Sequence, residues 1–430
     1  MDLGSTTKPY DTLIIGAGAA GMMAAITAGR RDKRVLLLEK LPKIGAKLKA
    51  TGGGRCNLSN TLSNEDFTQA FGKDGRFMQT AIDAFDHHAL RDFFTSIGVE
   101  TDAPDGFRIF PVGHSSQTIL DALSTEMERV GVEVQCGQRV KEIKKKNNQF
   151  LVGCVVPSEM PLGYQHTLTP ISYTTQTLIL ATGGKGYPQL GAEGDGYDLA
   201  ALFGHTSTSI FPAMMPLKVA EKWVDTCRAD TIANAHIIVD IKKYRKLQAR
   251  GDLIFTKQGI RGPVVLDFSR EITPLLDKDI EVPILINMTK GMNEEAVRKH
   301  IREKHADNTH YTTLQLLETL LPTSLSEVLC QLSDADPLLG FSKQKGSTRE
   351  RLIQLLAWVP LTVIGHDGFD KAMITRGGIK LGEIDPHTME SKLAEGLYFC
   401  GEVVNLDGPC GGYNLQWAFS SGFMAGSSSL

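Results

Sequence analysis

The 430-residue sequence lacks the cysteine and charge patterns of several specialised protein classes. Its seven cysteines include no CxxC pair, which argues against zinc ribbons and dithiol redox sites. An odd number of widely spread cysteines is typical of reduced thiols in a cytosolic protein. The 46 Lys and Arg residues face 49 Asp and Glu, and no long basic stretch occurs. The formal charge of −3 therefore argues against nucleic acid or an anionic membrane as a partner.

Long hydrophobic runs are also missing. The one stretch that resembles a signal or membrane segment, Leu13 to Gly29, contains four glycines and has no basic leader or small-residue cleavage site. It is too short and too interrupted to cross a bilayer. We expect a soluble, cytoplasmic protein without a membrane partner. Its length is sufficient for two or three domains with their own cores.

Glycine is abundant, and its positions near the N-terminus predict a nucleotide-binding loop. A short apolar strand, Asp11 to Ile15, runs into the GxGxxG sequence at residues 16–21, and residues 22–26 have helical character. A second apolar strand ends in Glu39, 18 residues beyond Gly21. This order of strand, glycine loop, helix, strand and acid is the dinucleotide fingerprint. The acid favours a free ribose 2′-hydroxyl, and hence FAD or NAD over NADP.

A second glycine-rich segment favours FAD over NAD. Residues 43–57 read as a loop with three consecutive glycines, where a plain dehydrogenase would continue into another crossover helix. Such a backbone can lie against a large flat ligand, and Lys47 and Arg55 can meet phosphate or flavin oxygens. A mobile surface turn is the alternative. Cys56 has no resolving cysteine nearby, so we interpret it mainly as a packing residue.

Two segments downstream complete the predicted site. An apolar strand, Thr177 to Ala181, ends in Thr182 and Gly183, and a second strand near the C-terminus ends in Gly401 and Glu402. Residues 411–418 then open a helix with two glycines. Glycines ahead of a helix offer backbone donors for the electron-rich edge of a flavin ring. An ordinary strand–turn–helix that closes the fold is the alternative.

These stretches together resemble one flavoprotein family. The chain is similar to the two-dinucleotide-binding-domain flavoproteins, and specifically to the bacterial family of BaiN-type reductases and aminoacetone-oxidase-like proteins. The matching stretches are IIGAGAAGMMAA, KLKATGGGRCNLSN, LILATGG, LIFTKQGIRGPVVLDFS, and ITRGGIKLGEID with GLYFCGEVVNLDGPCGGYNLQWA. The resemblance implies FAD as the cofactor. With the fingerprint, it gives these predicted FAD-binding residues: Gly16, Ala17, Gly18, Ala19, Ala20, Gly21, Glu39, Lys40, Lys47, Gly52, Gly53, Gly54, Arg55, Cys56, Asn57, Val140, Ala181, Thr182, Gly183, Gly401, Glu402, Gly412, Tyr413, Asn414, Leu415 and Gln416.

The middle of the chain predicts an insert in an α/β fold. We expect a Rossmann-like, glutathione-reductase-like FAD-binding domain from residues 1–204 and 380–430. A β-barrel-like insert covers 205–290 and 358–379, and a small helical insert covers 291–357. Predicted strands are 235–242, 253–256, 264–268 and 282–287, and a capping box at 347–350 starts one helix. Segments 133–136, 140–143 and 150–156 are predicted to form a small separate sheet.

The sequence does not identify the catalytic group. Arg108 and His114 lie in a predicted loop between aromatics, just before a helix, and with Tyr413 they are the catalytic candidates. His300, His305 and His310 are five residues apart, which does not place them on one helical face, so we expect no metal site. A second GxGxxG fingerprint is missing, so NAD(P)H is expected only as a transient electron donor.

The predicted function is that of an FAD-dependent oxidoreductase that transfers hydride through flavin N5. We favour NAD(P)H-dependent reduction of an activated C=C bond, or of a carbonyl-conjugated group, in a small-molecule substrate. Oxidation of a small amine by oxygen is an alternative within the same class. A flavoprotein in RNA modification, or a redox-sensing binding module, is an alternative from another class.

Overall fold

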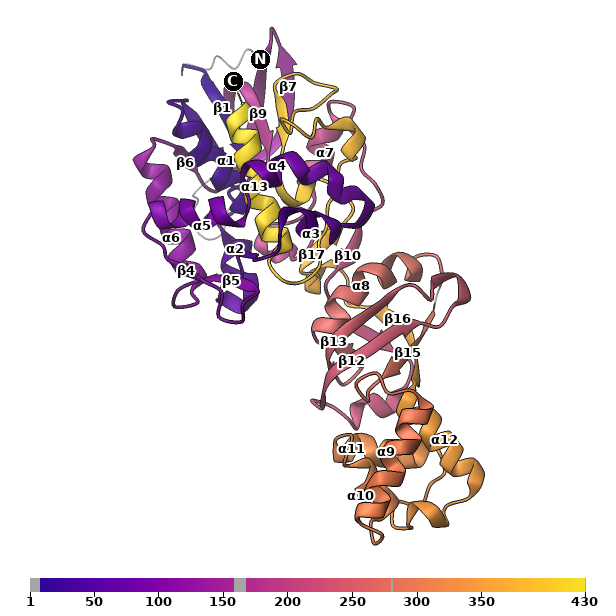
Figure 1. Cartoon of the computed structure of the whole chain (residues 1–430). Coiled ribbons are helices and arrows are strands. Elements are labelled where there is room, and N and C mark those ends of the chain that lie inside the picture. Colours follow the sequence, from indigo (N-terminus) through magenta and orange to yellow (C-terminus); the bar gives the residue numbers. More distant parts are fainter. Residues whose placement is uncertain (1–7, 158–167, 280, 430) are drawn as a thin grey trace, which may run out of the picture. The chain divides into compact units, whose positions relative to one another are not determined.

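A computed structural model describes residues 8–157, 168–279 and 281–429 (Figure 1). The chain forms two compact units, Met1–Phe211 with Ile374–Leu430, and Pro212–Met373. The three-part division expected above stays a prediction. Among the described residues, no helix combines the length and apolar character needed to cross a membrane.

The first unit is built on a seven-stranded sheet. Its order is β6-β2-β1-β9-β8-β7, with β18 paired to β9. The strands are β1 (Tyr10–Ile15), β2 (Val35–Leu38), β6 (Glu133–Gln135), β7 (Arg139–Lys146), β8 (Gln149–Pro157), β9 (Leu168–Leu180) and β18 (Leu397–Phe399). The pairs β6–β2, β2–β1, β1–β9 and β9–β18 are parallel, whereas β7–β8 and β8–β9 are antiparallel. The prediction of a small separate sheet was therefore wrong, because β6, β7 and β8 all belong to the main sheet.

Helices cover this sheet, and the first and last of them pack together. They are α1 (Ala19–Gly29), α2 (Ala46–Ala50), α3 (Asn64–Gln69), α4 (Gln79–Ala84), α5 (His87–Ser96), α6 (Ser116–Arg129), α7 (Asp195–Ala201) and α13 (Tyr413–Ser428). Small residues of α13, Gly422 and Gly426, face Ala20 and Ala24 of α1. Every residue of α1 is buried, so the N-terminal fingerprint lies against the C-terminal helix. A small sheet of β3 (Ser59–Asn60), β5 (Arg108–Pro111) and β4 (Thr101–Asp102) completes the unit.

The second unit contains a closed barrel and a group of helices. The barrel order is β11-β14-β13-β12-β15-β16. Its strands are β11 (Leu217–Val219), β12 (Thr231–Val239), β13 (Gln248–Phe255), β14 (Gly259–Arg261), β15 (Val282–Asn287) and β16 (Val359–His366). The helices are α8 (Pro263–Leu276), α9 (Glu294–Asp307), α10 (Thr313–Leu317), α11 (Thr323–Leu332) and α12 (Gly346–Ala357). The short strands β10 (Phe211–Ala213) and β17 (Ile374–Arg376) lie where the chain passes between units.

Two local predictions for the second unit were wrong. Residues 264–268 form part of helix α8 instead of a strand, because a short apolar run fits a buried helix as well as a buried strand. The predicted capping box at 347–350 lies inside α12, which begins at Gly346. A capping box does exist at Thr312 and Gln315, at the start of α10. The side-chain oxygen of Asn293 caps α9 by accepting the N–H of Ala296.

Candidate cofactor site

The glycine loop between β1 and α1 is packed on one side and open on the other. A Cβ on Gly21 would lie 1.9 Å from the backbone oxygen of Gly16, so only glycine lets the helix approach the loop so closely. A Cβ on Gly18 would meet no atom within 4 Å. Gly18 is the N-cap of α1, so the open side of the loop is also the electropositive end of an 11-residue helix. This combination suits a pyrophosphate.

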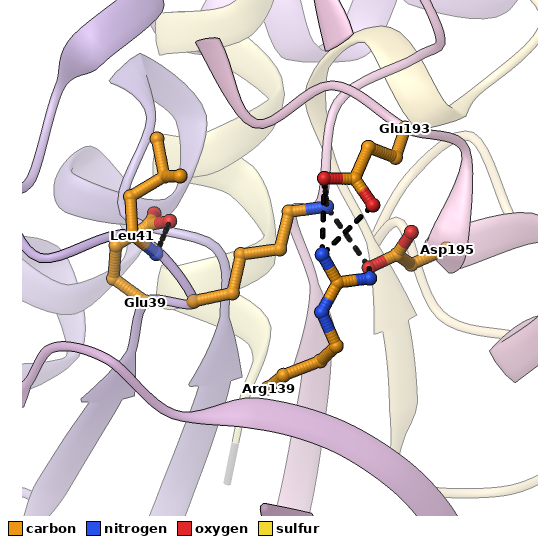
Figure 2. Close-up of polar contacts among 6 residues, drawn as sticks. Glu39, Leu41, Arg139, Glu193 and Asp195 are labelled. Atoms are coloured by element: carbon orange, nitrogen blue, oxygen red, sulfur yellow. Dashed lines mark hydrogen bonds and ion pairs between the residues drawn. The ribbon is translucent and has the colours of Figure 1, made fainter. Parts of the chain in front are cut away.

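Glu39 is held in place at the carboxyl end of β2. Its Oε2 accepts the backbone N–H of Ala17 at 2.9 Å, and its Oε1 accepts that of Leu41 at 2.9 Å. Figure 2 shows the second of these bonds. Two backbone donors fix the carboxylate beside the glycine loop, and each oxygen keeps acceptor capacity for a ribose hydroxyl.

An ion pair joins the N-terminal and C-terminal parts of the site. Nζ of Lys47, on α2, lies 2.7 Å from Oε2 of Glu402. The other oxygen of Glu402 accepts the backbone N–H of Thr375 at 2.7 Å. The Lys47 and Glu402 side chains are 25% and 21% exposed, so the pair stands at the wall of the site with some access to solvent. Both were predicted FAD contacts, and the fold brings them together.

The glycine loop at 52–57 also reaches the C-terminal turn. The side-chain amide of Asn57 joins the two segments when its oxygen and nitrogen are placed so that both form hydrogen bonds. Its oxygen then accepts the N–H of Gly412 at 3.1 Å, and its nitrogen donates to the backbone oxygen of Ser59 at 2.9 Å. Asn60 donates to the backbone oxygen of Gly411 at 2.9 Å. A Cβ on Gly412, whose φ is +86°, would lie 2.4 Å from the Ser59 oxygen. The close approach of these two segments therefore requires glycine.

Several predicted contacts have side chains that face the core. Cys56 is fully buried, and burial raises the pKa of its thiol to about 12, which supports a packing role. Tyr413 packs against Phe67, with ring centroids 5.0 Å apart, and Gln416 donates to the backbone oxygen of Phe85. Val140 is buried in β7. Their side chains are therefore largely engaged in packing within the unit.

The remaining predicted residues line the loops around these anchors. Ala181 donates its N–H to Ile15 and so continues the β1–β9 pairing, with Thr182 and Gly183 directly after it. Gly401 donates its N–H to the hydroxyl of Ser421 at 2.9 Å, and Asn414 bonds with both backbone groups of Gly408. A Cβ on Gly53, Gly54 or Gly183 would meet nothing within 4 Å, so the loops have room for a ligand.

Two of the catalytic candidates gather around one buried aromatic ring. The guanidinium of Arg108 lies 5.8 Å from the Phe110 ring centre, and that of Arg55 lies 5.6 Å from it. The His114 ring stacks on Phe110 at 4.9 Å. Arg108 also pairs with Asp105 at 2.6 Å. The side chains of Arg55, Arg108 and His114 therefore share one corner, next to the glycine loop at 52–57.

An ionic network lies beside Glu39 and was not predicted from the sequence (Figure 2). Lys40 contacts Asp195 at 2.9 Å, and Arg139 contacts Glu193 at 2.8 Å. The signal available in the sequence was the pair of glycines that flanks Asp195, the first residue of α7. Thr375 was also missed, although it lies next to the ITRGG stretch that carried part of the resemblance.

The residues present suit FAD as the cofactor. The open cradle at Gly18 would hold the pyrophosphate, Glu39 the adenosine ribose, and Lys47 with Glu402 the polar chain that leads to the flavin. The loops at 52–57 and 411–412 would carry the flavin ring. When bound, FAD supplies hydride transfer at its N5 atom.

This fold and site define an FAD-dependent oxidoreductase. The chain belongs to the family described as the HI0933-like protein Rossmann domain, whose model matches residues 10–428. The chain is 33% identical to the 3-dehydro-bile acid delta(4,6)-reductase of Clostridium scindens, over 96% of this chain and 97% of that protein. It is 28% identical to the ribosomal RNA dihydrouridine synthase of Escherichia coli, over 96% of each.

Solved structures show the same fold at lower identity. The 3-ketosteroid-delta4-(5alpha)-dehydrogenase of Rhodococcus jostii, in complex with 4-androstene-3,17-dione, superposes with a TM-score of 0.52 at 16% identity. That match covers 100% of this chain and 98% of the other. A flavocytochrome c3 fumarate reductase in its open conformation superposes with a TM-score of 0.51 at 17% identity. That match covers 99% of this chain and 78% of the other.

Proposed function

We propose that this protein is an FAD-dependent reductase that saturates a carbon–carbon double bond conjugated to a carbonyl group, with NAD(P)H as the reductant. One carbon of the double bond gains a hydride and the other gains a proton, so each turnover consumes NAD(P)H and a proton. The observation that carries the proposal is the identity of 33% along almost the whole chain to a relative named as a delta(4,6)-reductase of a 3-dehydro-bile acid.

The chain's own residues support such a reaction by positioning and charge. The N-terminus of the 16-residue helix α13, at Gly412, places partial positive charge beside the loop proposed to carry the flavin ring. That charge favours a reduced, anionic ring. Arg55, Arg108 and His114 stand at the same side of the unit, where they can meet the polarised oxygen of a conjugated carbonyl. Their shared corner around Phe110 is therefore the proposed substrate-facing surface.

A two-step anaerobic assay tests the proposal. The flavin of the holoprotein should bleach on addition of NADH or NADPH, and its absorption should return when a 3-oxo-Δ4,6-steroid is added. The saturated 3-oxosteroid is the matched control, and its addition should not restore the flavin absorption. Bleaching by an amine, followed by reoxidation with peroxide formation in air, would instead support the amine oxidase.

A second candidate is reduction of a uridine base in RNA, and a surface of the second unit favours it. The turn between β12 and β13, together with the start of β13, carries five exposed cations within nine residues, at Lys242, Lys243, Arg245, Lys246 and Arg250. Of these, Arg245 pairs with Asp240 at 3.1 Å, and Lys243 lies over the ring of Tyr244. Cations interleaved with an aromatic residue suit a phosphate backbone and a stacked base. Dihydrouridine differs from uridine by saturation of a C=C bond conjugated to a carbonyl, so the chemistry is shared.

Charge reversal at this turn separates the two candidates. If RNA is the substrate, the triple variant Lys242→Glu, Lys243→Glu, Lys246→Glu should bind a ribosomal RNA fragment more weakly. The slope of its affinity against salt should also be shallower by roughly one per lost phosphate contact. The variant Lys299→Glu, Lys304→Glu on α9 is the matched control. Equal and weak RNA binding by the wild type, the triple variant and the α9 control would contradict the RNA candidate and favour the small-molecule reductase.

A further inference from the structure

A short segment crosses the carboxyl edge of the main sheet. Residues 185–195, called the strap here, lie between β9, which ends at Leu180, and α7, whose first residue is Asp195. In the sheet, β1 lies between β9 and β2. The chain enters the strap five residues beyond the carboxyl end of β9, and the far end of the strap is bonded to Lys40, two residues beyond β2. It therefore passes over the carboxyl end of β1, the edge along which dinucleotides bind in this type of fold.

The near end of the strap is fixed to a residue of the proposed site. The hydroxyl oxygen of Thr375 accepts the backbone N–H groups of Lys185 at 2.6 Å and Gly186 at 3.1 Å. The backbone N–H of Thr375 in turn donates to Glu402. This end is thus joined to the ion pair between Lys47 and Glu402.

The far end is fixed by a four-residue ionic network (Figure 2). Lys40 lies 2.9 Å from Asp195 and 3.5 Å from Glu193. Arg139 lies 2.8 Å from Glu193 and 3.3 Å from Asp195. Each cation contacts both carboxylates, so loss of one member weakens two contacts. The four side chains are between 14% and 36% exposed, which leaves their attraction open to screening by salt.

Between its two ends the strap depends on turns and few apolar contacts. Tyr187, Gly191 and Gly194 all have positive φ, of +59°, +93° and +89°. Ala192 and Gly186 are its only buried residues among the eleven. With so little apolar burial, the charges at the far end supply a large share of what holds the strap down.

We propose that Lys40, Arg139, Glu193 and Asp195 form an ionic latch that holds the strap closed over the adenosine half of FAD and sets the rate at which the cofactor leaves. This proposal rests on the proposed FAD site. Lys40 is adjacent in sequence to Glu39, and Arg139 is adjacent to Val140, so the latch lies beside two of the predicted FAD contacts. Lys40 and Arg139 are positioning residues in this account. Salt opens the latch by screening its four contacts, and the strap then swings free of the crevice.

The rate of FAD release from the holoprotein tests the latch. Release is followed by the rise in flavin fluorescence after dilution, at about 20 mM and about 500 mM NaCl, between which the Debye length shrinks several-fold. Wild-type protein should release FAD several-fold faster at high salt. Arg139→Gln should release it roughly three- to tenfold faster than wild type at low salt and should respond little to added salt. Arg139→Lys, which keeps the charge without the bidentate fork, should fall between them.

The matched control is Arg298→Gln in the second unit. Arg298 pairs with Glu350, also on the surface, and its side chain is 35% exposed, like that of Arg139. Its loss should change neither release nor the salt response. Glu193→Gln gives a second test of the latch should Arg139→Gln fail to fold, and it should behave like Arg139→Gln.

Two results would overturn the latch, and they differ in meaning. If wild type binds FAD but the folded latch variants release it at the wild-type rate in both salts, the network only supports the fold. If wild-type protein binds no FAD even after reconstitution, the proposed function fails, and the latch fails with it.

Discussion

Lys47 and Glu402 are 355 residues apart in the sequence, yet their side chains form an ion pair of 2.7 Å. The first lies on α2, the short helix that follows the nucleotide fingerprint, and the second lies in the turn after the strand β18. Because both side chains are partly buried, neither charge is fully compensated by water when its partner is removed. The pair therefore ties the two sequence halves of the cofactor site together.

Removal of one partner of this pair should weaken FAD binding. Glu402→Gln keeps the shape of the side chain but leaves Lys47 unpaired and reduces the hold on Thr375. We expect about a tenfold loss of FAD affinity, or about 1.4 kcal/mol. Isothermal titration of the apoprotein measures it. In a double-mutant cycle with Lys47→Met, a coupling energy near zero would show that the two residues act independently.

The two sides of the glycine loop should respond in opposite ways to one added methyl group. Gly18→Ala meets no atom within 4 Å and should leave the melting temperature of the apoprotein unchanged, while it blocks the pyrophosphate and lowers FAD affinity at least tenfold. Gly21→Ala places a Cβ 1.9 Å from the Gly16 oxygen and should destabilise the fold by several kcal/mol. Thermal melts with and without FAD separate the two effects. A Gly18→Ala protein with wild-type affinity for FAD would contradict the placement of the pyrophosphate at Gly18.

The ribose contact predicts a graded series at Glu39. Glu39→Ala should weaken FAD binding by about 1.5–3 kcal/mol, because a charge-assisted hydrogen bond is lost and the N–H groups of Ala17 and Leu41 lose their acceptor. Glu39→Asp should lose less, since the charge remains and only its reach is shortened. Flavin fluorescence titration of folded variants gives the affinities. Equal FAD affinity in the wild type, Glu39→Ala and Glu39→Asp would contradict a contact between Glu39 and the ribose.

A buried histidine should make stability depend on pH. His205 lies 3.2 Å from Glu383 through Nδ1 and 2.7 Å from the Ser391 hydroxyl through Nε2, and its ring packs on Phe399. Burial lowers the pKa of His205 below its usual 6.5. In the range between the lowered pKa and 6.5 the unfolded chain binds more protons, so stability should be complete above pH 6.5 and fall as the pH falls through that range.

Urea unfolding at several pH values checks this expectation. His205→Gln cannot titrate and should flatten the pH dependence, although His87, His300 and His366, whose pKa values are also lowered, leave a residual slope. The same slope in wild type and variant would contradict the role given to His205.

The parts of the molecule that were predicted correctly rest on signals within short stretches of sequence. The strand β1, the glycine loop, α1 and β2 follow one another within 30 residues, and the packing of the loop on α1 has a local steric reason. The wrong predictions depended on distant partners. Nothing in residues 264–268 distinguishes a buried helix from a strand, and the pairing of β6 with β2 requires knowledge of which strand lies beside which edge. Arg139 and Glu193 are 54 residues apart, so only the fold could bring them together.

The central claim, that both halves of the chain bind one FAD, is tested most directly by the cofactor itself. Purified protein should be yellow and should release FAD on denaturation, in a ratio of about one per chain after reconstitution, identified by chromatography and by its fluorescence rise on phosphodiesterase treatment. The ADP moiety is what the Gly18 cradle and Glu39 are shaped to hold. Release of FMN alone, or the absence of any flavin after reconstitution, would contradict the account.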